Sequence, residues 1–406
     1  MKNIKLFFTA TYLLLQTACN SQQTSTNLAN PYNSPKANVD TTSTIVCGAE
    51  RLETILPLLQ NKRVALLVNQ TSVIGNTHLA DTLLALKVDI KKIFAPEHGF
   101  RGEADAGDHV SNGMDSRTGI KIISLYGSKM KPSKDDLKDI DVVVFDIQDV
   151  GARFYTYITS LHYLMEACAE NNKEVVVLDR PNPNGFYVDG PVLKKGFESF
   201  VGIDPIPVVH GLTVGEYAQM VNGEKWLAKG ITCKLNVVTC LNYKHRMRYK
   251  LPIKPSPNMP NEIAVYNYPS ICYFEGTDIS VGRGTDNQFQ VLGAPQITVR
   301  NFSFKPVSKP GAKLPPHINQ ICFGYDLRRV NTLKDEINLS YLIDCYKAFS
   351  DTSNFFLPTL FFDKLAGSDQ LRKQIIAGKT ETEIKATWKE DLDAYKLKRL
   401  KYLLYE

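Results

Sequence analysis

Short apolar runs alternate with amphipathic stretches along the first half of the chain. Continuous aliphatic runs occupy residues 63–68, 90–95, 120–125, 142–147 and 175–178. Apolar residues at helical spacing lie between these runs, at 79–86 and 158–168. A strand of a parallel sheet reads as a continuous apolar run because helices cover both faces of the sheet. The pattern therefore predicts an α/β fold, with a Rossmann-like, mostly parallel sheet and helices on both faces.

The pattern changes after residue 250. Four prolines between 252 and 260 indicate a linker, and shorter strand-like runs follow at 296–300 and 320–325. The last helix is predicted to begin at about Thr380, with apolar residues on one face and charges opposite. A chain of 406 residues suits two domains. We expect a Rossmann-like domain over 45–254 and a C-terminal α+β auxiliary domain over 255–406.

The N-terminus has the features of an export signal. Lys2 and Lys5 accompany an apolar stretch at 4–15, which is too short to cross a bilayer as a mature helix. A small residue, Ala18, stands directly before Cys19, as at a lipoprotein cleavage site. The pattern favours a lipid anchor at Cys19, and an ordinary cleaved signal with an incidental cysteine is the alternative.

Residues 20–44 are rich in Ser, Thr, Asn, Gln and Pro and contain few large apolar side chains. Such a segment cannot bury enough apolar surface to fold. We therefore expect a signal peptide over 1–18 and a flexible tether over 19–44. The protein would be exported and anchored to a membrane, with its folded part facing the periplasm.

Charge and cysteine content change this picture little. The formal net charge is +6, and the basic residues are scattered, whereas a nucleic-acid binder concentrates them on one face or tail. Seven cysteines follow Cys19, and none shows C-x-x-C spacing. We favour free, buried cysteines over disulfides, although Cys233 and Cys240 are close in sequence. No G-x-G-x-x-G follows the first apolar run, so a dinucleotide cofactor is not expected.

Polar side chains gather where the predicted strands end. They are Asn69 after the first run, Glu97, His98 and Arg101 after the second, and Asp146, Gln148, Asp149, Arg153 and Tyr155 at and after the fourth. Ligands of open parallel sheets bind just beyond the carboxyl ends of the strands. We therefore expect these residues to surround one binding site.

Two carboxylates at one site suit glycoside hydrolysis, in which one carboxylic acid protonates the leaving oxygen and a second group completes the displacement. Glu97 is the predicted acid, and Asp146 or Asp149 is its predicted partner. Each of the three has an alternative interpretation as a loop carboxylate that binds backbone amides. A substrate carboxylate would require a cation, and Arg101, Arg153 and Arg283 are the candidates.

A metal site is the less favoured interpretation of the same loop. His98, Asp105 and His109 are residue types that bind zinc, but their spacing matches no established metal motif. We therefore predict no metal.

Several long segments of the sequence resemble the NamZ/YbbC family of exo-β-N-acetylmuramidases. The similar segments include "VNQTSV", "FAPEHGFRGEADAG", "VVVFDIQDVGARFYTYITSL", "VVLDRPNPNG", "HGLTVGEYA", "PSPNMPN" and "FEGTDISVGRGT". They follow the family's order and cover nearly all of the chain after the tether. The resemblance implies a Rossmann-like catalytic domain, a C-terminal auxiliary domain and a cleft at their interface.

The resemblance also implies an activity and a partner. Members release N-acetylmuramic acid (MurNAc) from the non-reducing ends of peptidoglycan fragments and require no known cofactor. The glutamate of "PEHG", here Glu97, is the implied catalytic residue. We expect Glu275 and Arg283 of "FEGTDISVGRGT" to join the site from the second domain. The alternatives are a catalytically silent sugar-binding lipoprotein and an exo-β-N-acetylglucosaminidase. The configuration of the product stays open.

Overall fold

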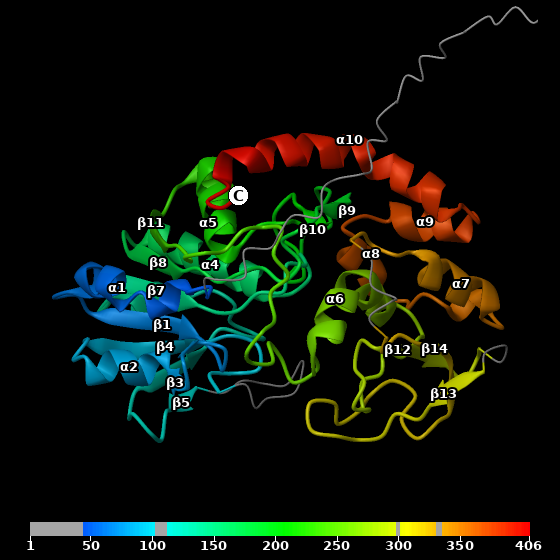
Figure 1. Cartoon of the computed structure of the whole chain (residues 1–406), viewed down its shortest axis with the longest axis horizontal. Coiled ribbons are helices and arrows are strands. Elements are labelled where there is room, and N and C mark those ends of the chain that lie inside the picture. Colours follow the sequence, from blue (N-terminus) through cyan, green and yellow to red (C-terminus); the bar gives the residue numbers. More distant parts are fainter. Residues whose placement is uncertain (1–43, 102–111, 298–300, 330–334) are drawn as a thin grey trace, which may run out of the picture. The chain divides into compact units, whose positions relative to one another are not determined.

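The apolar runs of the first half form the strands of one sheet (Figure 1). The computed structural model describes residues 44–101, 112–297, 301–329 and 335–406. In this part the sheet has seven strands, in the order β11-β8-β7-β1-β4-β6-β5. Their bounds are β1 (Val64–Val68), β4 (Ile90–Ala95), β5 (Gly113–Met114), β6 (Lys121–Ser124), β7 (Val142–Asp146), β8 (Glu174–Leu178) and β11 (Lys234–Val238).

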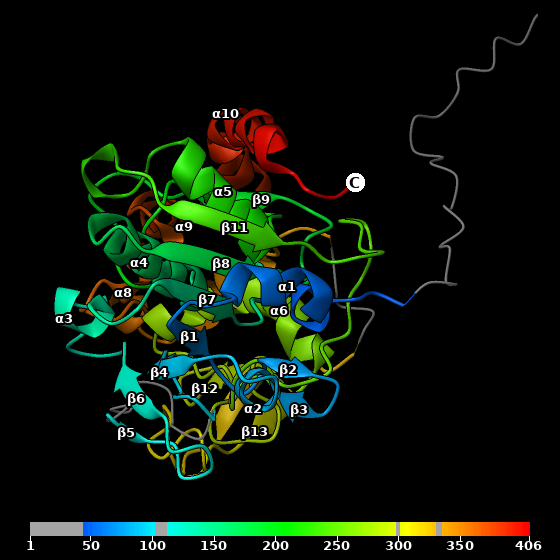
Figure 2. The same ribbon diagram turned by 90° about the vertical axis from the view of Figure 1, so that its left-hand side faces the viewer.

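The described strands of this sheet are parallel except for β5, which pairs antiparallel with β6. β1 lies at the centre, where Val64 is opposite Ile90 of β4 and Val142 of β7. Figure 2 shows the strands stacked from β11 to β6 in this order. Numbered along the chain, the parallel strands have the Rossmann order, in which the direction of progression reverses beside the first strand. The predicted parallel pairing is confirmed, so the carboxyl ends of β1, β4 and β7 share one edge.

Helices cover both faces of the sheet, as predicted. Val64 and Leu66 share an apolar cluster with Ile55 of helix α1, whereas Ala65 shares another with Leu161 of helix α4. Successive strand residues point to opposite faces, which explains this alternation. The helices of this half are α1 (Leu52–Leu59), α2 (Leu79–Ala85), α3 (Lys134–Leu137), α4 (Tyr157–Glu170) and α5 (Val214–Gly223).

Small elements complete the first half. They are the hairpin strands β2 (Val73–Ile74) and β3 (Thr77–His78), the antiparallel pair β9 (Asp189–Val192) and β10 (Pro207–Val209), and the 3-10 helices η1 (Gly48–Glu50) and η2 (Ala228–Gly230). Neither β11 nor the β9–β10 pair is evident from apolar periodicity. β11 is an outer strand with Lys234 and Asn236 among its residues, so it lacks a continuous apolar run.

The second half combines helices with a small antiparallel sheet. Its strands are β12 (Val291–Ala294), β13 (Phe302–Phe304) and β14 (Cys322–Asp326). Its helices are α6 (Glu262–Ile271), η3 (Cys272–Gly276), α7 (Ser340–Ala348), η5 (Thr352–Asn354), α8 (Phe361–Ala366), α9 (Gln370–Ile376), α10 (Glu381–Arg399) and η6 (Leu400–Tyr402). The α+β character predicted for this half is confirmed.

The predicted strand-like run at 296–300 is not confirmed. β12 ends at Ala294, directly before Pro295, which has no N–H to donate to a sheet. Residues 296 and 297 belong to no strand, and residues 298–300 lie outside the described part. The run at 320–325 does form β14. The last helix begins directly after Thr380, as predicted from the sequence. The structure adds that the Thr380 side chain caps this helix by accepting a hydrogen bond from the backbone N–H of Glu383.

The proline-rich segment between the halves is docked against the first half. The carbonyl of Pro255 accepts hydrogen bonds from Tyr155 at 2.8 Å and from Gln70 at 3.0 Å. Helix α10 also crosses between the halves, where the Tyr395 hydroxyl donates to the His210 carbonyl at 2.7 Å (Figure 1). Residues 44–406 form one compact unit, and the domain boundary at residue 254 stays a prediction.

The predicted signal peptide, Cys19 and nearly all of the predicted tether lie outside the described residues. No helix within the described ranges combines the length and the apolar character needed to cross a bilayer. The seven cysteines of the described part, all after residue 44, are free and buried, which confirms the prediction for them.

Candidate active site

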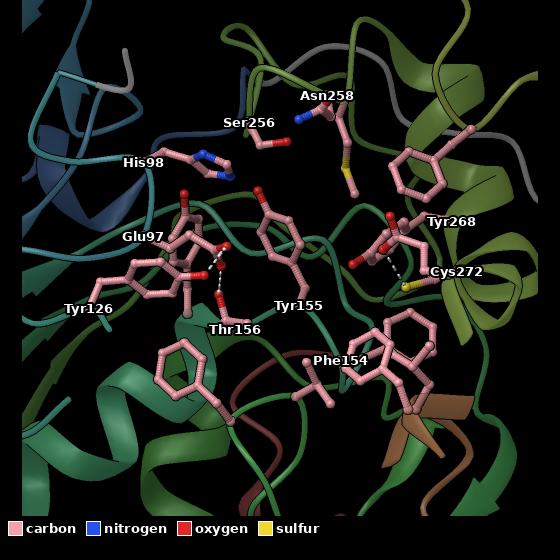
Figure 3. Close-up of a pocket in the computed structure, with 18 of the residues that line it drawn as sticks. Glu97, His98, Tyr126, Phe154, Tyr155, Thr156, Ser256, Asn258, Tyr268 and Cys272 are labelled. Carbon is pink, nitrogen blue, oxygen red and sulfur yellow. Dashed lines mark hydrogen bonds between the residues drawn. The ribbon is translucent and has the colours of Figure 1, made fainter. Parts of the chain in front are cut away.

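A tight turn after β4 places Glu97 at the carboxyl edge of the sheet. β4 ends at Ala95, and the Gly99 amide donates to the Pro96 carbonyl at 3.0 Å to close the turn. His98 has a φ of 68° and Gly99 a φ of 81°. The left-handed conformation is uncommon for a residue with a side chain, and residues that adopt it are often found at functional sites. The turn directs Glu97 into a pocket (Figure 3).

Both carboxylate oxygens of Glu97 accept hydrogen bonds. The Tyr126 hydroxyl donates to Oε1 at 2.8 Å, and the Thr156 hydroxyl donates to Oε2 at 2.7 Å. Tyr126 follows β6, and Thr156 directly precedes α4. Figure 3 shows the two hydroxyls pointing at Glu97. Two donors from separate elements fix the orientation of the carboxyl group, which is a requirement for general acid or base catalysis.

The pocket has a cavity volume of about 410 Å³. Aromatic side chains form much of its wall, and they are Tyr126, Phe154, Tyr155, Tyr157, Phe200, Tyr268, Phe289 and Phe361. Tyr155 packs edge-on against Tyr157 and Tyr268, with ring centroids 5.0 and 5.8 Å apart. An apolar wall with a few oriented polar groups is typical of a site for a small molecule, and the volume of this cavity lies within the range of such sites.

The second half contributes an ion pair to the pocket. Nε of Arg283 donates to Oε1 of Glu275 at 2.5 Å, and the Cys272 thiol donates to Oε2 at 3.7 Å. Burial lowers the pKa of Arg283, but the neighbouring Glu275 carboxylate outweighs this effect and raises it. Within the described part, the buried Nη1 of Arg283 has no hydrogen-bond partner. Arg283 is therefore a cation whose Nη1 can still donate a hydrogen bond to a ligand in the pocket.

The segment between the two halves contributes polar groups. Ser256 and Asn258 line the pocket, and the Pro255 carbonyl holds the Tyr155 hydroxyl. Burial raises the pKa of Tyr155, so this phenol is neutral at neutral pH. Tyr155 thus offers the pocket a neutral aromatic ring.

The structure brings together five of the residues predicted from the sequence, which are Glu97, His98, Tyr155, Glu275 and Arg283. Pocket residues that the sequence-based prediction omitted include Tyr126, Thr156, Ser256, Asn258 and Tyr268. Thr156 directly follows Tyr155, and Ser256 and Asn258 belong to the "PSPNMPN" segment, so the family resemblance was a usable signal for them.

The expectation that Asp146 lines the pocket is wrong. Asp146 is fully buried, and Nε and Nη2 of Arg180 donate to its two oxygens at 2.5 and 2.9 Å. Burial lowers the pKa of Arg180, but its interaction with Asp146 outweighs this effect and raises it. A buried carboxylate needs such a partner. Asp146 therefore joins the ends of β7 and β8.

Arg153 does not line the pocket either. Its side chain is fully buried, and its guanidinium donates to the carbonyls of Pro191, Ile206 and Leu365 at 2.8 to 2.9 Å. Burial lowers the pKa of Arg153 to about 10. Leu365 belongs to α8, whereas the other two carbonyls come from the β9–β10 region. Arg153 therefore joins the two halves by hydrogen bonds.

The side chains of Gln148 and Asp149 form hydrogen bonds with backbone groups of the loops around them. The Gln148 amide donates to the carbonyls of Asp149 and Pro181 at 2.8 Å, and Asp149 accepts from the Gly151 amide at 2.6 Å. Neither residue lines the pocket. These contacts match the alternative interpretation of Asp149 as a loop carboxylate.

Asn69 and Arg101 also lie outside the pocket lining. The Asn69 side-chain oxygen accepts from Thr71, at 2.9 Å from its amide and 2.6 Å from its hydroxyl. Nη2 of Arg101 lies 3.0 Å from both oxygens of Asp115. Both side chains therefore bind neighbouring residues instead of lining the pocket.

The metal interpretation rests partly on Asp105 and His109, which lie outside the described residues. Among the residues with described positions, no group of three or more His, Cys, Asp or Glu side chains is arranged to hold a metal ion.

Comparison with known proteins agrees with the family resemblance found in the sequence. The model "Exo-beta-N-acetylmuramidase NamZ, N-terminal" matches residues 64–263, and the corresponding C-terminal model matches residues 266–405. The chain is 38% identical over 379 residues to the peptidoglycan beta-N-acetylmuramidase NamZ of Bacillus subtilis (strain 168), covering 87% of this chain and 90% of that protein.

Two crystal structures of DUF1343 family proteins from Bacteroides fragilis NCTC 9343 are similar to most of this chain. One is 49% identical with a TM-score of 0.83 and covers 90% of this chain and 99% of its own. The other is 32% identical with a TM-score of 0.77 and covers 89% of this chain and 99% of its own. With both family models matched in order and a full-length relative above 30% identity, the chain belongs to the NamZ exo-β-N-acetylmuramidase family.

Proposed function

We propose that this protein is an exo-acting glycoside hydrolase that releases MurNAc from the non-reducing ends of peptidoglycan fragments, with Glu97 as its general acid/base. The observation that carries this proposal is the placement of Glu97. It is held by Tyr126 and Thr156 in the lining of an aromatic pocket with a volume of about 410 Å³, which we expect to take one sugar unit. The relative from B. subtilis carries the name of the same activity.

The walls of the pocket suit an amino sugar. Aromatic rings such as Tyr155 and Tyr268 offer flat apolar surfaces to the C–H faces of a sugar ring. Ser256 and Asn258 offer hydrogen-bonding groups to its hydroxyl and acetamido substituents. These contacts require no cofactor, and we propose none.

Recognition of MurNAc, as opposed to N-acetylglucosamine (GlcNAc), falls to Arg283. MurNAc carries a lactyl ether whose carboxylate is ionised at neutral pH, and burying that charge without a partner is costly. Arg283 lines the pocket, keeps 20% of its side chain exposed and uses only Nε to bind Glu275. A charge-assisted hydrogen bond from its guanidinium offsets the lost hydration. Among the predicted arginines, Arg283 replaces Arg153 as the candidate because Arg153 is fully buried.

The test compares two synthetic aryl glycosides that differ only in the lactyl group. We expect the protein to cleave the β-MurNAc glycoside and to leave the β-GlcNAc glycoside largely intact. On peptidoglycan fragments, single MurNAc units should appear from the non-reducing end. Binding without any turnover would identify a silent sugar-binding protein instead, and preference for the GlcNAc glycoside would identify an N-acetylglucosaminidase.

We also propose that the protein is exported and lipid-anchored through Cys19. The support is the sequence alone, which places a basic start, an apolar stretch at 4–15 and Ala18 before this cysteine. Metabolic labelling with an alkynyl fatty acid should mark the native protein, and a Cys19→Ser variant should lose the label and leave the membrane fraction. An unlabelled native protein with an N-terminus generated by ordinary signal cleavage would contradict the anchor.

A further inference from the structure

Glu275 is the second carboxylate of the pocket. The described residues that line the pocket include two acidic side chains, Glu97 and Glu275. Glu97 follows β4 in the first half, whereas Glu275 lies in η3 of the second half. Figure 3 shows Glu97 and Cys272 on opposite sides of the pocket, with Tyr155 between them. Because the Cys272 thiol donates to Glu275, the two carboxylates approach the enclosed space from opposite sides.

The two carboxylates have different electrostatic surroundings. Glu275 accepts a 2.5 Å hydrogen bond from the Arg283 guanidinium, which is a charged donor. Glu97 instead accepts its hydrogen bonds from two neutral donors, the Tyr126 and Thr156 hydroxyls. A glycosidase that activates water needs one carboxylic acid beside the leaving oxygen and one carboxylate on the opposite face of the sugar ring. The charged partner of Glu275 suits the second of these two positions.

We propose that Glu275 is the general base of the reaction, opposite Glu97 as the general acid. This proposal rests on the proposed function. The proton of Glu97 moves to the glycosidic oxygen while the bond between that oxygen and C1 of MurNAc breaks. A water molecule attacks C1 from the other face, its oxygen forms the new bond, and one of its protons moves to Glu275. The β-glycoside therefore yields α-MurNAc, with inverted configuration.

This role differs from an indirect role in which Glu275 only orients Arg283. An orienting carboxylate affects substrate binding and therefore changes mainly KM. A general base acts in the transition state and therefore changes kcat, by roughly 10²–10⁴-fold. The two roles also respond differently to the leaving group, because a good leaving group needs no proton from an acid but still needs an activated water.

The experiment uses the full chain and a series of aryl β-MurNAc glycosides of increasing leaving-group acidity. We expect Glu275→Gln to lower kcat by roughly 10²-fold or more for every member of the series. Glu97→Gln should lose activity mainly on the poor leaving groups. Azide, which attacks C1 without a base, should restore turnover of Glu275→Gln and give the α-glycosyl azide. A Glu275→Gln variant with kcat within tenfold of the unaltered protein, a raised KM and no azide rescue would overturn the proposal.

Thermal unfolding shows whether the Glu275→Gln variant is folded, since it breaks a partly buried pair. The unaltered protein gives an independent test that needs no variant. NMR of the first-formed product should show the α anomer, and a first-formed β anomer would overturn the general-base role in favour of a direct nucleophile or the substrate's own acetamido group. If the unaltered protein cleaves no MurNAc glycoside, the proposed function fails. If it does cleave one, a contrary result in the Glu275→Gln kinetics or in the NMR of the product overturns only the role of Glu275.

Discussion

The Thr156 hydroxyl donates a 2.7 Å hydrogen bond to Glu97, which joins the start of α4 to the turn after β4. Thr156 is the N-cap residue of α4, yet its side chain makes no capping hydrogen bond within the helix. Its hydroxyl is therefore available for Glu97. The Tyr126 hydroxyl holds the other carboxylate oxygen at 2.8 Å.

The first prediction follows from these two contacts. Tyr126→Phe and Thr156→Val each remove one donor, so the Glu97 carboxyl group samples more orientations. We expect each variant to lower kcat by about fivefold to thirtyfold, which corresponds to about 1–2 kcal/mol for one hydrogen bond, with a smaller change in KM. Helix α4 should remain intact in Thr156→Val because no cap is lost.

Tyr163→Phe is the matched control, since Tyr163 lies in α4 but does not line the pocket. Steady-state kinetics on an aryl β-MurNAc glycoside provides the measurement. Full activity in both Tyr126→Phe and Thr156→Val would show that Glu97 does not depend on these donors.

A second prediction concerns Arg283 and substrate choice. Arg283→Lys keeps a positive charge beside Glu275 but replaces the planar fork with a single ammonium group. We expect the ratio of kcat/KM for MurNAc glycosides over GlcNAc glycosides to fall about tenfold to a hundredfold, because a hydrogen bond to a charged group contributes about 1.5–3 kcal/mol. The ratio cancels any shared effect through Glu275. An unchanged ratio would remove Arg283 from lactyl recognition.

The third prediction separates Arg153 from the site. Arg153→Met removes the guanidinium that donates to the carbonyls of Pro191, Ile206 and Leu365. The Ile206 carbonyl keeps the Leu193 amide as a donor, but the loss of a buried hydrogen-bond partner costs about 1–3 kcal/mol at each of the other two carbonyls. Urea unfolding should show a drop of about 3 kcal/mol or more in the free energy of unfolding. The MurNAc-to-GlcNAc ratio of the folded variant should stay unchanged. A stable variant that has lost its preference for MurNAc would return Arg153 to the binding site.

Asp146 provides the fourth prediction. Asp146→Asn removes one charge of the buried pair with Arg180 and leaves the other uncompensated, which costs about 3–5 kcal/mol. The midpoint of denaturant unfolding should therefore fall, while kcat of the folded enzyme stays within about tenfold. A stable variant with kcat reduced more than a hundredfold would make Asp146 a catalytic residue after all.

The sequence predicts the parallel sheet well because its strands are buried on both faces. The runs at 142–147 and 175–178 are apolar without interruption, so their periodicity has one interpretation. β11 is not predicted by this pattern, because it is an outer strand and Lys234 and Asn236 interrupt its apolar run. The strand expected at 296–300 is not found at 296 and 297, the part of this run that the structure describes, because β12 ends at Ala294, directly before Pro295.

The candidate site is only partly predictable from the sequence. The rule that ligands bind at the carboxyl ends of strands places Glu97 correctly but does not separate it from Asp146. That distinction depends on Arg180, which follows β8 and forms a buried ion pair with Asp146. Likewise, Arg153 and Arg283 look alike in sequence, and only packing shows that carbonyls surround the first and a pocket adjoins the second.

The role of Glu97 as general acid is tested most directly by the rate at which Glu97→Gln turns over an aryl β-MurNAc glycoside with a poor leaving group. This substitution keeps the shape of the side chain but removes its titrating proton. We expect kcat to fall by roughly 10²–10⁴-fold while the dissociation constant for MurNAc, measured by calorimetry, changes little. Glu262→Gln, an exposed substitution outside the pocket, should retain full activity as the matched control. A loss of less than tenfold in the folded Glu97→Gln variant would contradict the account.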